Sequence, residues 1–444
     1  MNLHLTWDHA YAGRAEPGSA FCGEMADKFA GQIKSGELPF LTLEHIPELE
    51  KELAGISDYL SGFKHMLLLG IGGSALGARA LQKAFFPARD RPGHNGPWLW
   101  IMDNVCSDSL KACMSGLDPR ETVVVVVSKS GGTIETLSQY FLLRSWLEKA
   151  IPAGWQEHLI MVTDPEKGFL REECRKHGIR SLAVPQKMGG RYSVLSAVGM
   201  LPALFLGIDY AEIVAGARET AEGIVSDPQG LASSRPGGVP GLALWAADLI
   251  RAGYSQLIFF TYIPAWADFG DWFAQLWAES LGKSGLGSTP VPAVGVTDQH
   301  SLQQLFLDGP RDKGCLFLSA GNMDPGPRFP EELPGKWTHL QGRSFGDLLH
   351  AEGLGTRMAM VENDIPLVHI RAESPSPRAA GRLIAALEGM TYLTGLILGI
   401  NPLDQPAVEL GKRLANAELG APGFSLEKKR LQEFKLKNRK KEVL

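Results

Sequence analysis

A run of hydroxyl, glycine and lysine residues follows a strongly apolar segment of the chain. Residues 122–127 are one threonine and five valines, and the next six residues read SKSGGT. Where a strand gives way to a helix, unpaired backbone N–H groups and the positive end of the helix dipole attract anions. We therefore predict a phosphate-binding loop, whereas the alternative is an ordinary glycine turn with Thr133 as helix cap. The loop residues are Ser128, Lys129, Ser130, Gly131, Gly132 and Thr133.

A second glycine turn, GIGGSALG (70–77), follows an earlier apolar run. If the two strands are neighbours, Gly73 and Ser74 can bind the same phosphate from the other side. The competing interpretation is a dinucleotide-binding fingerprint that begins at Gly70, with Asp103 as the acid that binds ribose. A loose glycine fingerprint of this kind is common, so it favours a dehydrogenase only weakly.

Two further stretches join glycines to titratable side chains. KMGGRYSVLSAVGM (187–200) contains Arg191 after a Gly-Gly turn. QLWAESLGKSG (275–285) places Gln275 and Glu279 four residues apart, on one face of a predicted helix. Taken alone, the arginine also fits a surface ion pair and the glutamate a solvated helix acid.

The last two stretches contain a histidine, two amides and a lysine. DQHS (298–301) carries His300, and NPLDQPAVELGK (401–412) carries Gln405 and Lys412. With GIGGS and SKSGGTIET, these stretches resemble the glucose-6-phosphate isomerase (phosphoglucose isomerase) family, in the family's order from about residue 65 to about residue 415.

The resemblance implies an enzyme that interconverts glucose 6-phosphate and fructose 6-phosphate. The sugar ring opens, and a proton then moves between C2 and C1 through an enediolate. A carboxylate can take the proton from one carbon and return it to the other, and Glu279 matches the family's base. Arg191 matches the cation that stabilises the enediolate oxygens. The shift is internally redox-neutral, so no cofactor and no metal is expected.

The resemblance also assigns the residues around the base. His300 and Lys412 match the groups that move protons during ring opening, for which a histidine is well suited. Gln275 and Gln405 are expected to hydrogen-bond sugar hydroxyls or phosphate. Glu135 matches a glutamate near the family's histidine, although a favourable charge in the first helical turn explains it equally well. The resemblance also implies a homodimer in which His300 reaches into the partner's site.

Three departures and one rival function accompany the resemblance. Leu281 stands where the family usually has asparagine, Ala407 where it usually has glycine, and the basic C-terminal tail also differs. The rival is a non-catalytic sugar-phosphate sensor, which would need only the phosphate-binding turns. The joint presence of glutamate, arginine, histidine and lysine at the matching positions argues against a sensor.

Apolar runs predict the strands that position these residues. The runs are continuous, as expected for parallel strands buried on both faces, and helix-like segments such as 133–150 alternate with them. We therefore expect an α/β fold of two doubly wound α/β/α sandwich subdomains, of the sugar isomerase type, with mainly parallel sheets. The predicted strands are 65–70, 98–103, 122–128, 158–164, 181–185, 256–263, 291–297, 314–320 and 366–372.

A segment rich in proline, glycine and serine divides this alternation. The predicted parts are an N-terminal helical extension (1–45), a first α/β domain (46–225), a linker (226–241), a second α/β domain (242–415) and a basic tail (416–444).

The composition limits the partners. The 444 residues have a formal net charge of −5, so no overall field attracts nucleic acid. Five scattered cysteines favour reduced thiols in the cytoplasm. The N-terminal residues do not read as a signal peptide, and no apolar run is long enough for a membrane span. The eleven histidines show no metal-ligand spacing. The expected partners are therefore a hexose 6-phosphate and a second copy of the chain.

Overall fold

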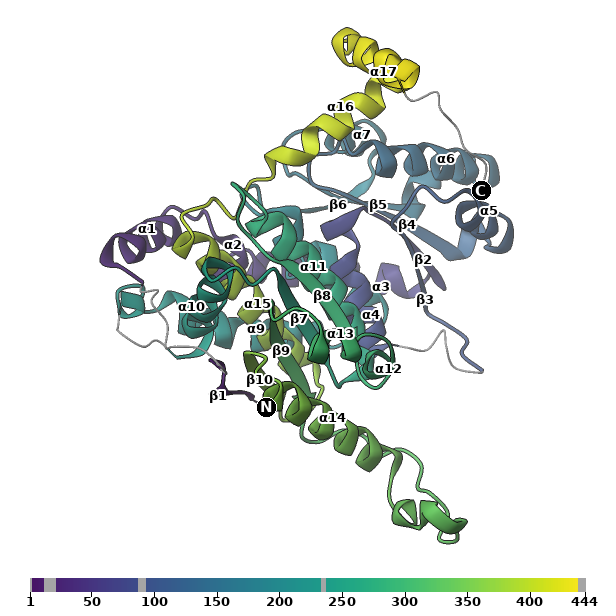
Figure 1. The fold of residues 1–444 in the computed structure, drawn as a ribbon. Coiled ribbons are helices and arrows are strands. Elements are labelled where there is room, and N and C mark those ends of the chain that lie inside the picture. The colour runs from purple at the N-terminus through teal and green to yellow at the C-terminus, as the bar shows by residue number, and fades with distance from the viewer. Residues whose placement is uncertain (1, 12–20, 87–92, 233–236, 438–444) are drawn as a thin grey trace. The chain divides into compact units, whose positions relative to one another are not determined.

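The computed structural model describes residues 2–11, 21–86, 93–232 and 237–437. Its contacts divide the chain into two units, Met1–Pro402 and Leu403–Leu444. The first unit contains two five-stranded sheets, each with helices on both faces (Figure 1). The predicted α/β/α fold class with mainly parallel sheets is confirmed.

The first sheet has the order β3-β2-β4-β5-β6, and all its strands run parallel. The valine run of β4 lies at its centre and is buried on both faces, as a continuous apolar run predicts. The strands are β2 (His65–Leu69), β3 (Trp98–Met102), β4 (Thr122–Ser128), β5 (Leu159–Thr163) and β6 (Arg180–Ala183).

Helices cover both faces of the first sheet. On one face, apolar side chains of three helices pack against β2, β4 and β5. These helices are α5 (Ser107–Gly116), α6 (Ile134–Ala150) and α7 (Phe169–His177). On the other face, Gln82 donates to the carbonyl of Leu99, and three further helices pack together. They are α3 (Ile46–Ser61), α4 (Leu76–Phe85) and α8 (Ala197–Phe205).

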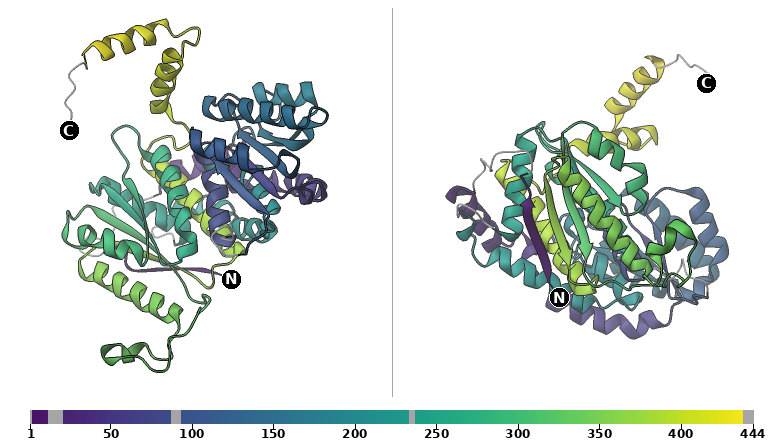
Figure 2. Two further views of the ribbon diagram at one scale, coloured as in Figure 1. Left: turned by 90° about the vertical axis from the view of Figure 1, so that its right-hand side faces the viewer. Right: turned by 60° about the horizontal axis from the view of Figure 1, so that its bottom comes forward.

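The second sheet repeats this topology, with the order β8-β7-β9-β10-β1. β7 takes the position of β2, and β9 takes that of β4. Strand β1 pairs antiparallel with β10 at the edge, whereas the other strands are parallel (Figure 2). The strands are β1 (Leu3–His9), β7 (Gln256–Thr261), β8 (Thr289–Val294), β9 (Lys313–Ala320) and β10 (Leu367–Ala372).

The second sheet also has helices on both faces. Phe306 of α13 and Met360 of α14 belong to the apolar cluster on one face. On the other face, Phe273 of α11 packs on Phe259 of β7, and α10 lies against Gly314 of β9. α11 also contacts α4, so it links the two sandwiches. The helices are α10 (Gly238–Arg251), α11 (Ala267–Leu281), α13 (Gln303–Asp308) and α14 (Phe345–Glu362).

Helices α9 (Tyr210–Val225) and α15 (Pro377–Ile397) pack closely together. Glycines make this approach possible, because a Cβ on Gly216 would overlap the carbonyl oxygen of Arg378 in the opposite helix. Nearly all of α15 is buried, including Glu388, whose carboxyl oxygens have no hydrogen-bond partner among the described residues. Burial raises the pKa of Glu388 well above its ordinary value.

The remaining segments depart in part from the predicted ones. The predicted helical extension, 1–45, is wrong at its start, because β1 pairs there with β10; α1 (Gly23–Lys34) and α2 (Pro39–Thr42) follow. The predicted linker, 226–241, lies between the two sheets along the chain, and α10 begins inside it. Residues 233–236 of that linker and 438–444 of the tail lie outside the described residues.

The second unit begins at Leu403, before the predicted tail of 416–444, and its described part consists of short helices. They are α16 (Glu409–Glu418) and α17 (Ser425–Lys437), preceded by a 3-10 turn at Pro406–Val408. In the described segments, no helix is long and apolar enough to cross a membrane. All five cysteines are free thiols.

Candidate active site

The phosphate-loop residues lie at the carboxyl end of β4. Gly131 has φ +64°, a left-handed conformation that favours glycine. The hydroxyls of Ser128 and Thr133 lie 3.0 Å apart, and the N–H of Gly132 donates to Ser130 Oγ over 3.3 Å. The Thr133 side chain does not cap α6. The structure therefore gathers hydroxyls and backbone donors at the first turn of a helix, where an anion is favoured.

Lys129 adds a cation beside this turn. Its side chain is partly buried, and burial lowers its pKa, although the nearby Asp164 opposes that shift. A lysine that has already lost part of its hydration can interact strongly with a bound anion.

The second glycine turn leaves the same edge of the sheet, because β2 and β4 are parallel neighbours. It forms a 3-10 turn at Gly72–Ser74, which packs on another 3-10 turn at Gly190–Tyr192. A Cβ on Gly73 would overlap the carbonyl of Gly190, and a Cβ on Gly72 would overlap the side chain of Gln275. Glycine is thus required at both positions for the backbone to approach the rest of the site.

The Glu279 carboxylate lies beside these turns and has a donor on each oxygen. Gln275 Nε2 donates to Oε1 over 3.0 Å, and Arg191 Nη1 donates to Oε2 over 3.2 Å. Gln275 and Glu279 lie one turn apart in α11, as their spacing predicted. The structure therefore brings together three predicted residues from two separate segments of the chain.

Groups that the sequence reasoning missed fix the position of Arg191. Its side chain is 3% exposed. Its Nε donates to Ser280 Oγ over 2.8 Å and its Nη2 donates to the carbonyl of Pro402 over 2.6 Å. The hydroxyl of Tyr192 lies 3.0 Å from the same Ser280 Oγ. Ser280 and Tyr192 each adjoin a predicted residue, but nothing in their type or spacing signals this role.

His300 and Glu135 are not joined to this group. His300 lies in the short helix α12 (Thr297–Ser301) and is exposed. Among the described residues, the side chains of His300 and Glu135 form no hydrogen bond or ion pair, although the Glu135 carbonyl accepts from Ser138 Oγ over 2.8 Å. Glu135 lies in the first turn of α6, just after the phosphate loop.

Gln405 and Lys412 belong to the second unit. Gln405 precedes the 3-10 turn and is exposed. Lys412 in α16 forms an exposed ion pair with Glu409 over 2.8 Å. The Ala407 departure falls in the same 3-10 turn, whereas Leu281 is fully buried at the end of α11.

Asp103 is the residue that would bind ribose if the chain held a dinucleotide. It forms an ion pair with Arg79 of α4, so its carboxylate is already engaged within the chain.

Among the described residues, no group of three or more histidine, cysteine, aspartate or glutamate side chains could hold a metal ion.

Comparison with known proteins decides the family. The model of the family described as phosphoglucose isomerase matches residues 55–320 and 356–427. The chain belongs to the phosphoglucose isomerase family. It is 35% identical to a glucose-6-phosphate isomerase of Carboxydothermus hydrogenoformans, over 96% of this chain and 93% of that protein. It is 39% identical to one of Rubrobacter xylanophilus, over 86% and 88% of the two chains. The resemblance found in the sequence is thereby confirmed.

Solved structures share the fold. A hypothetical protein of Thermus thermophilus superposes with a TM-score of 0.79 at 32% identity, over 89% of this chain and 94% of that one. A glucose-6-phosphate isomerase of Chlamydia trachomatis superposes with a TM-score of 0.73 at 24% identity, over 87% and 76% of the two chains.

Proposed function

We propose that the chain interconverts glucose 6-phosphate and fructose 6-phosphate. The observation that carries this proposal is the Glu279 carboxylate, which Gln275 and Arg191 hold beside two glycine turns. An aldose–ketose isomerase needs one base that reaches two adjacent carbons, a cation near two oxygens and an anchor for the phosphate. Family membership supports this reaction over a dehydrogenase or a sensor.

The phosphate is held first. The hydroxyls of Ser128, Ser130 and Thr133 and the N–H groups of the glycine turn donate to its oxygens, while Lys129 balances charge. Ser74 contributes from the turn after β2. With the phosphate fixed, C1 and C2 are positioned relative to α11, which replaces a random encounter by a fixed geometry.

Proton transfer follows at Glu279. The carboxylate takes the proton from C2 and leaves an enediolate, and the resulting acid returns the proton to C1. Arg191 is held by a hydroxyl, a carboxylate and a carbonyl, so it is already oriented when negative charge develops on the oxygens. It therefore loses little conformational freedom during the reaction.

Ring opening requires a second set of groups. We assign it to His300 and Lys412, which move protons at the ring oxygen and the C1 hydroxyl, with Glu135 orienting the imidazole. Gln405 hydrogen-bonds the substrate. Among the described residues, no hydrogen bond joins His300 to Glu279, which is consistent with a homodimer in which each histidine serves the partner's site. We place this homodimer in the cytoplasm. The partners are a hexose 6-phosphate and this second copy, without nucleic acid, membrane, metal or cofactor.

A coupled assay tests the reaction. Purified protein is given glucose 6-phosphate, and the appearance of fructose 6-phosphate is followed. We expect turnover without added metal or nucleotide. Tight binding of the sugar phosphate without turnover would favour the sensor, and tight binding of NAD would favour the dehydrogenase.

Mixed dimers test the shared site. His300→Ala and Glu279→Gln chains are refolded together and separately. With random mixing, half the dimers are mixed and each has one site with both intact groups, so about a quarter of all sites recover. Mixed dimers that form but remain inactive would mean that each chain builds its site alone.

A further inference from the structure

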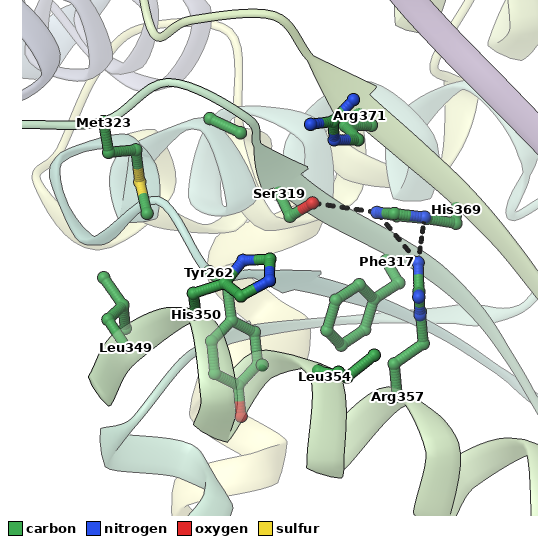
Figure 3. A pocket seen from close by; sticks show the side chains of 12 residues that line it. Tyr262, Phe317, Ser319, Met323, Leu349, His350, Leu354, Arg357, His369 and Arg371 are labelled. Atoms are coloured by element: carbon green, nitrogen blue, oxygen red, sulfur yellow. Dashed lines mark hydrogen bonds between the residues drawn. The ribbon is translucent and has the colours of Figure 1, made fainter. Parts of the chain in front are cut away.

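A cavity of about 130 Å³ lies at the edge of the second sheet, far along the chain from the glycine turns (Figure 3). Its walls are the carboxyl-terminal parts of β9 and β10 on one side and α14 on the other. This volume is several times the roughly 30 Å³ that one water molecule occupies in the liquid. Part of the wall comes from residues 321–355, which the family model does not match, so the cavity is not the shared active site.

The polar lining of this cavity is cationic. Arg357 comes from α14, and Arg371 comes from β10, two residues after His369 on the same face of the strand. Neither arginine forms an ion pair with any residue in the part of the chain that the structure describes. No lining residue is acidic. Arg357 is partly buried and Arg371 is exposed. With no carboxylate in the lining, the two guanidinium groups leave a local excess of positive charge.

A serine hydroxyl adds a donor. Burial and the two arginines lower the pKa of His369 to about 4, so its ring is neutral near pH 7. Arg357 can only donate, and its Nη1 is nearer to Nδ1 of His369 than to Nε2. The ring proton therefore lies on Nε2, which donates to Ser319 Oγ over 2.8 Å. Since Ser319 accepts here, its own proton can be donated to a ligand.

The position of the cavity matches that of the phosphate loop. β9 lies between β7 and β10 as β4 lies between β2 and β5. Ser319 is the next-to-last residue of β9, and Ser128 is the last residue of β4. In open α/β sheets, ligands bind outside the carboxyl ends of the strands. The two sheets therefore present a serine at corresponding edges, one among glycines and one among arginines.

We propose that this second-sheet pocket, formed by Ser319, Arg357, His369 and Arg371, binds a phosphate-type oxyanion, either inorganic phosphate or the phosphate of a small monoester. The two guanidinium groups pair with its charge, and Ser319 donates a hydrogen bond. Tyr262 and Phe317 provide an apolar wall against which the remainder of a monoester packs.

The test counts bound phosphate by equilibrium dialysis with radiolabelled inorganic phosphate. We expect two sites per parent chain, of which Thr133→Val weakens one and Arg357→Gln or Arg371→Gln weakens the other by about tenfold or more. The matched control is Arg218→Gln, an exposed arginine of α9, which should retain both sites. Thermal unfolding without phosphate checks that each variant is folded, and Arg371→Gln serves if Arg357→Gln does not fold.

Competition separates the two sources of the ligand. Displacement of labelled phosphate from the second-sheet pocket by glycerol 3-phosphate supports a monoester, and failure to displace it supports inorganic phosphate. Crystals of the parent soaked in tungstate should show anomalous density between Arg357 and Arg371. A single site per chain that only Thr133→Val weakens would overturn this proposal and leave the isomerase assignment intact. A single site that only Arg357→Gln or Arg371→Gln weakens would support the second-sheet pocket and contradict phosphate binding by the loop at 128–133.

Discussion

The two sheets have the same strand order but different turns at corresponding edges. After β2 and β4 come GIGGS and SKSGGT, whose glycines and hydroxyls present backbone and side-chain donors. After β7 comes Pro264–Trp266, with Trp266 fully buried, and after β9 comes a long segment that leads to α14. The first edge thus allows close approach of a ligand to the backbone, whereas the second is lined by side chains, which also form the walls of the cavity at β9 and β10.

This contrast shows that topology does not assign the chemistry. In the proposed mechanism, the first sheet supplies the turns that bind phosphate. The second supplies the carboxylate through α11, which follows β7 and contacts α4 of the first. Function therefore depends on turn composition and on one helix that crosses between the sandwiches. Each prediction below separates binding by the first sheet from chemistry by the second, or separates both from the stability of the α9–α15 pair.

The largest effect is expected for Glu279→Gln. The amide keeps the shape and loses the base, so kcat should fall by about 10²–10⁴-fold while substrate affinity changes little. The measurement is exchange of the C2 hydrogen with solvent, together with equilibrium binding of glucose 6-phosphate. Exchange at the parent's rate would show that Glu279 is not the base, and would contradict the proposal that the second sheet supplies the catalytic carboxylate.

Gly73→Ala should rank second. The new Cβ overlaps the carbonyl of Gly190, so the turn after β2 must move away from Arg191. A displacement of about 1 Å can cost roughly 100-fold in kcat/KM, and overpacking destabilises by about 1–3 kcal/mol. Gly223→Ala in α9 is the control, because a Cβ there meets nothing within 4 Å. Full activity in the Gly73 variant would show that close backbone approach is dispensable.

Thr133→Val should weaken phosphate binding without altering proton transfer. It removes one donor to a charged partner, worth about 1.5–3 kcal/mol. Inorganic phosphate should inhibit the variant less strongly, and KM for glucose 6-phosphate should rise, while kcat stays near the parent value. Ser138→Ala in α6, where the hydroxyl donates only to a backbone carbonyl, is the control. Undiminished inhibition in the Thr133 variant would place the phosphate elsewhere.

The smallest effect on catalysis is expected at Glu388 of α15, where a substitution changes stability rather than the candidate active site. The pKa of Glu388 is higher in the folded than in the unfolded chain, so the folded state holds a proton that the unfolded state has released. Above the unfolded pKa, this group therefore lowers stability by about 1.4 kcal/mol per pH unit until the folded pKa is reached. Glu388→Gln should remove that slope, and the exposed Glu222→Gln should not. Urea unfolding from pH 5 to pH 8 measures it; equal slopes in parent and Glu388→Gln would contradict the prediction.

Much of the fold follows from the sequence, because buried parallel strands read as continuous apolar runs. β4 was predicted with its observed bounds, and the other predicted strands differ by a few residues. β1 was missed because its apolar and polar residues alternate, as suits an edge strand, and its partner β10 lies at the opposite end of the chain. No local pattern encodes a pairing over that separation.

The site was predictable only in part. Residue type and spacing indicated the phosphate loop and placed Gln275 and Glu279 on one helix face. They could not show that Arg191 would reach Glu279, because that contact joins segments 88 residues apart. The roles of Ser280, Tyr192 and the Pro402 carbonyl depend on the same tertiary packing. The roles of the phosphate loop, Gln275, Glu279 and Arg191 stay predictions, as do those of His300, Gln405 and Lys412.

The close packing of α9 on α15 has a consequence for biosynthesis. α9 ends at Val225, and α15 begins at Pro377, so the ribosome adds about 150 residues before the partner exists. At about 5–20 residues per second, α9 waits roughly 8–30 s with its glycine-lined face unpaired. Local contacts within the first sheet can form during that time, but the non-local helix pair cannot. The nascent chain therefore exposes an apolar helix face to chaperones until synthesis is almost complete.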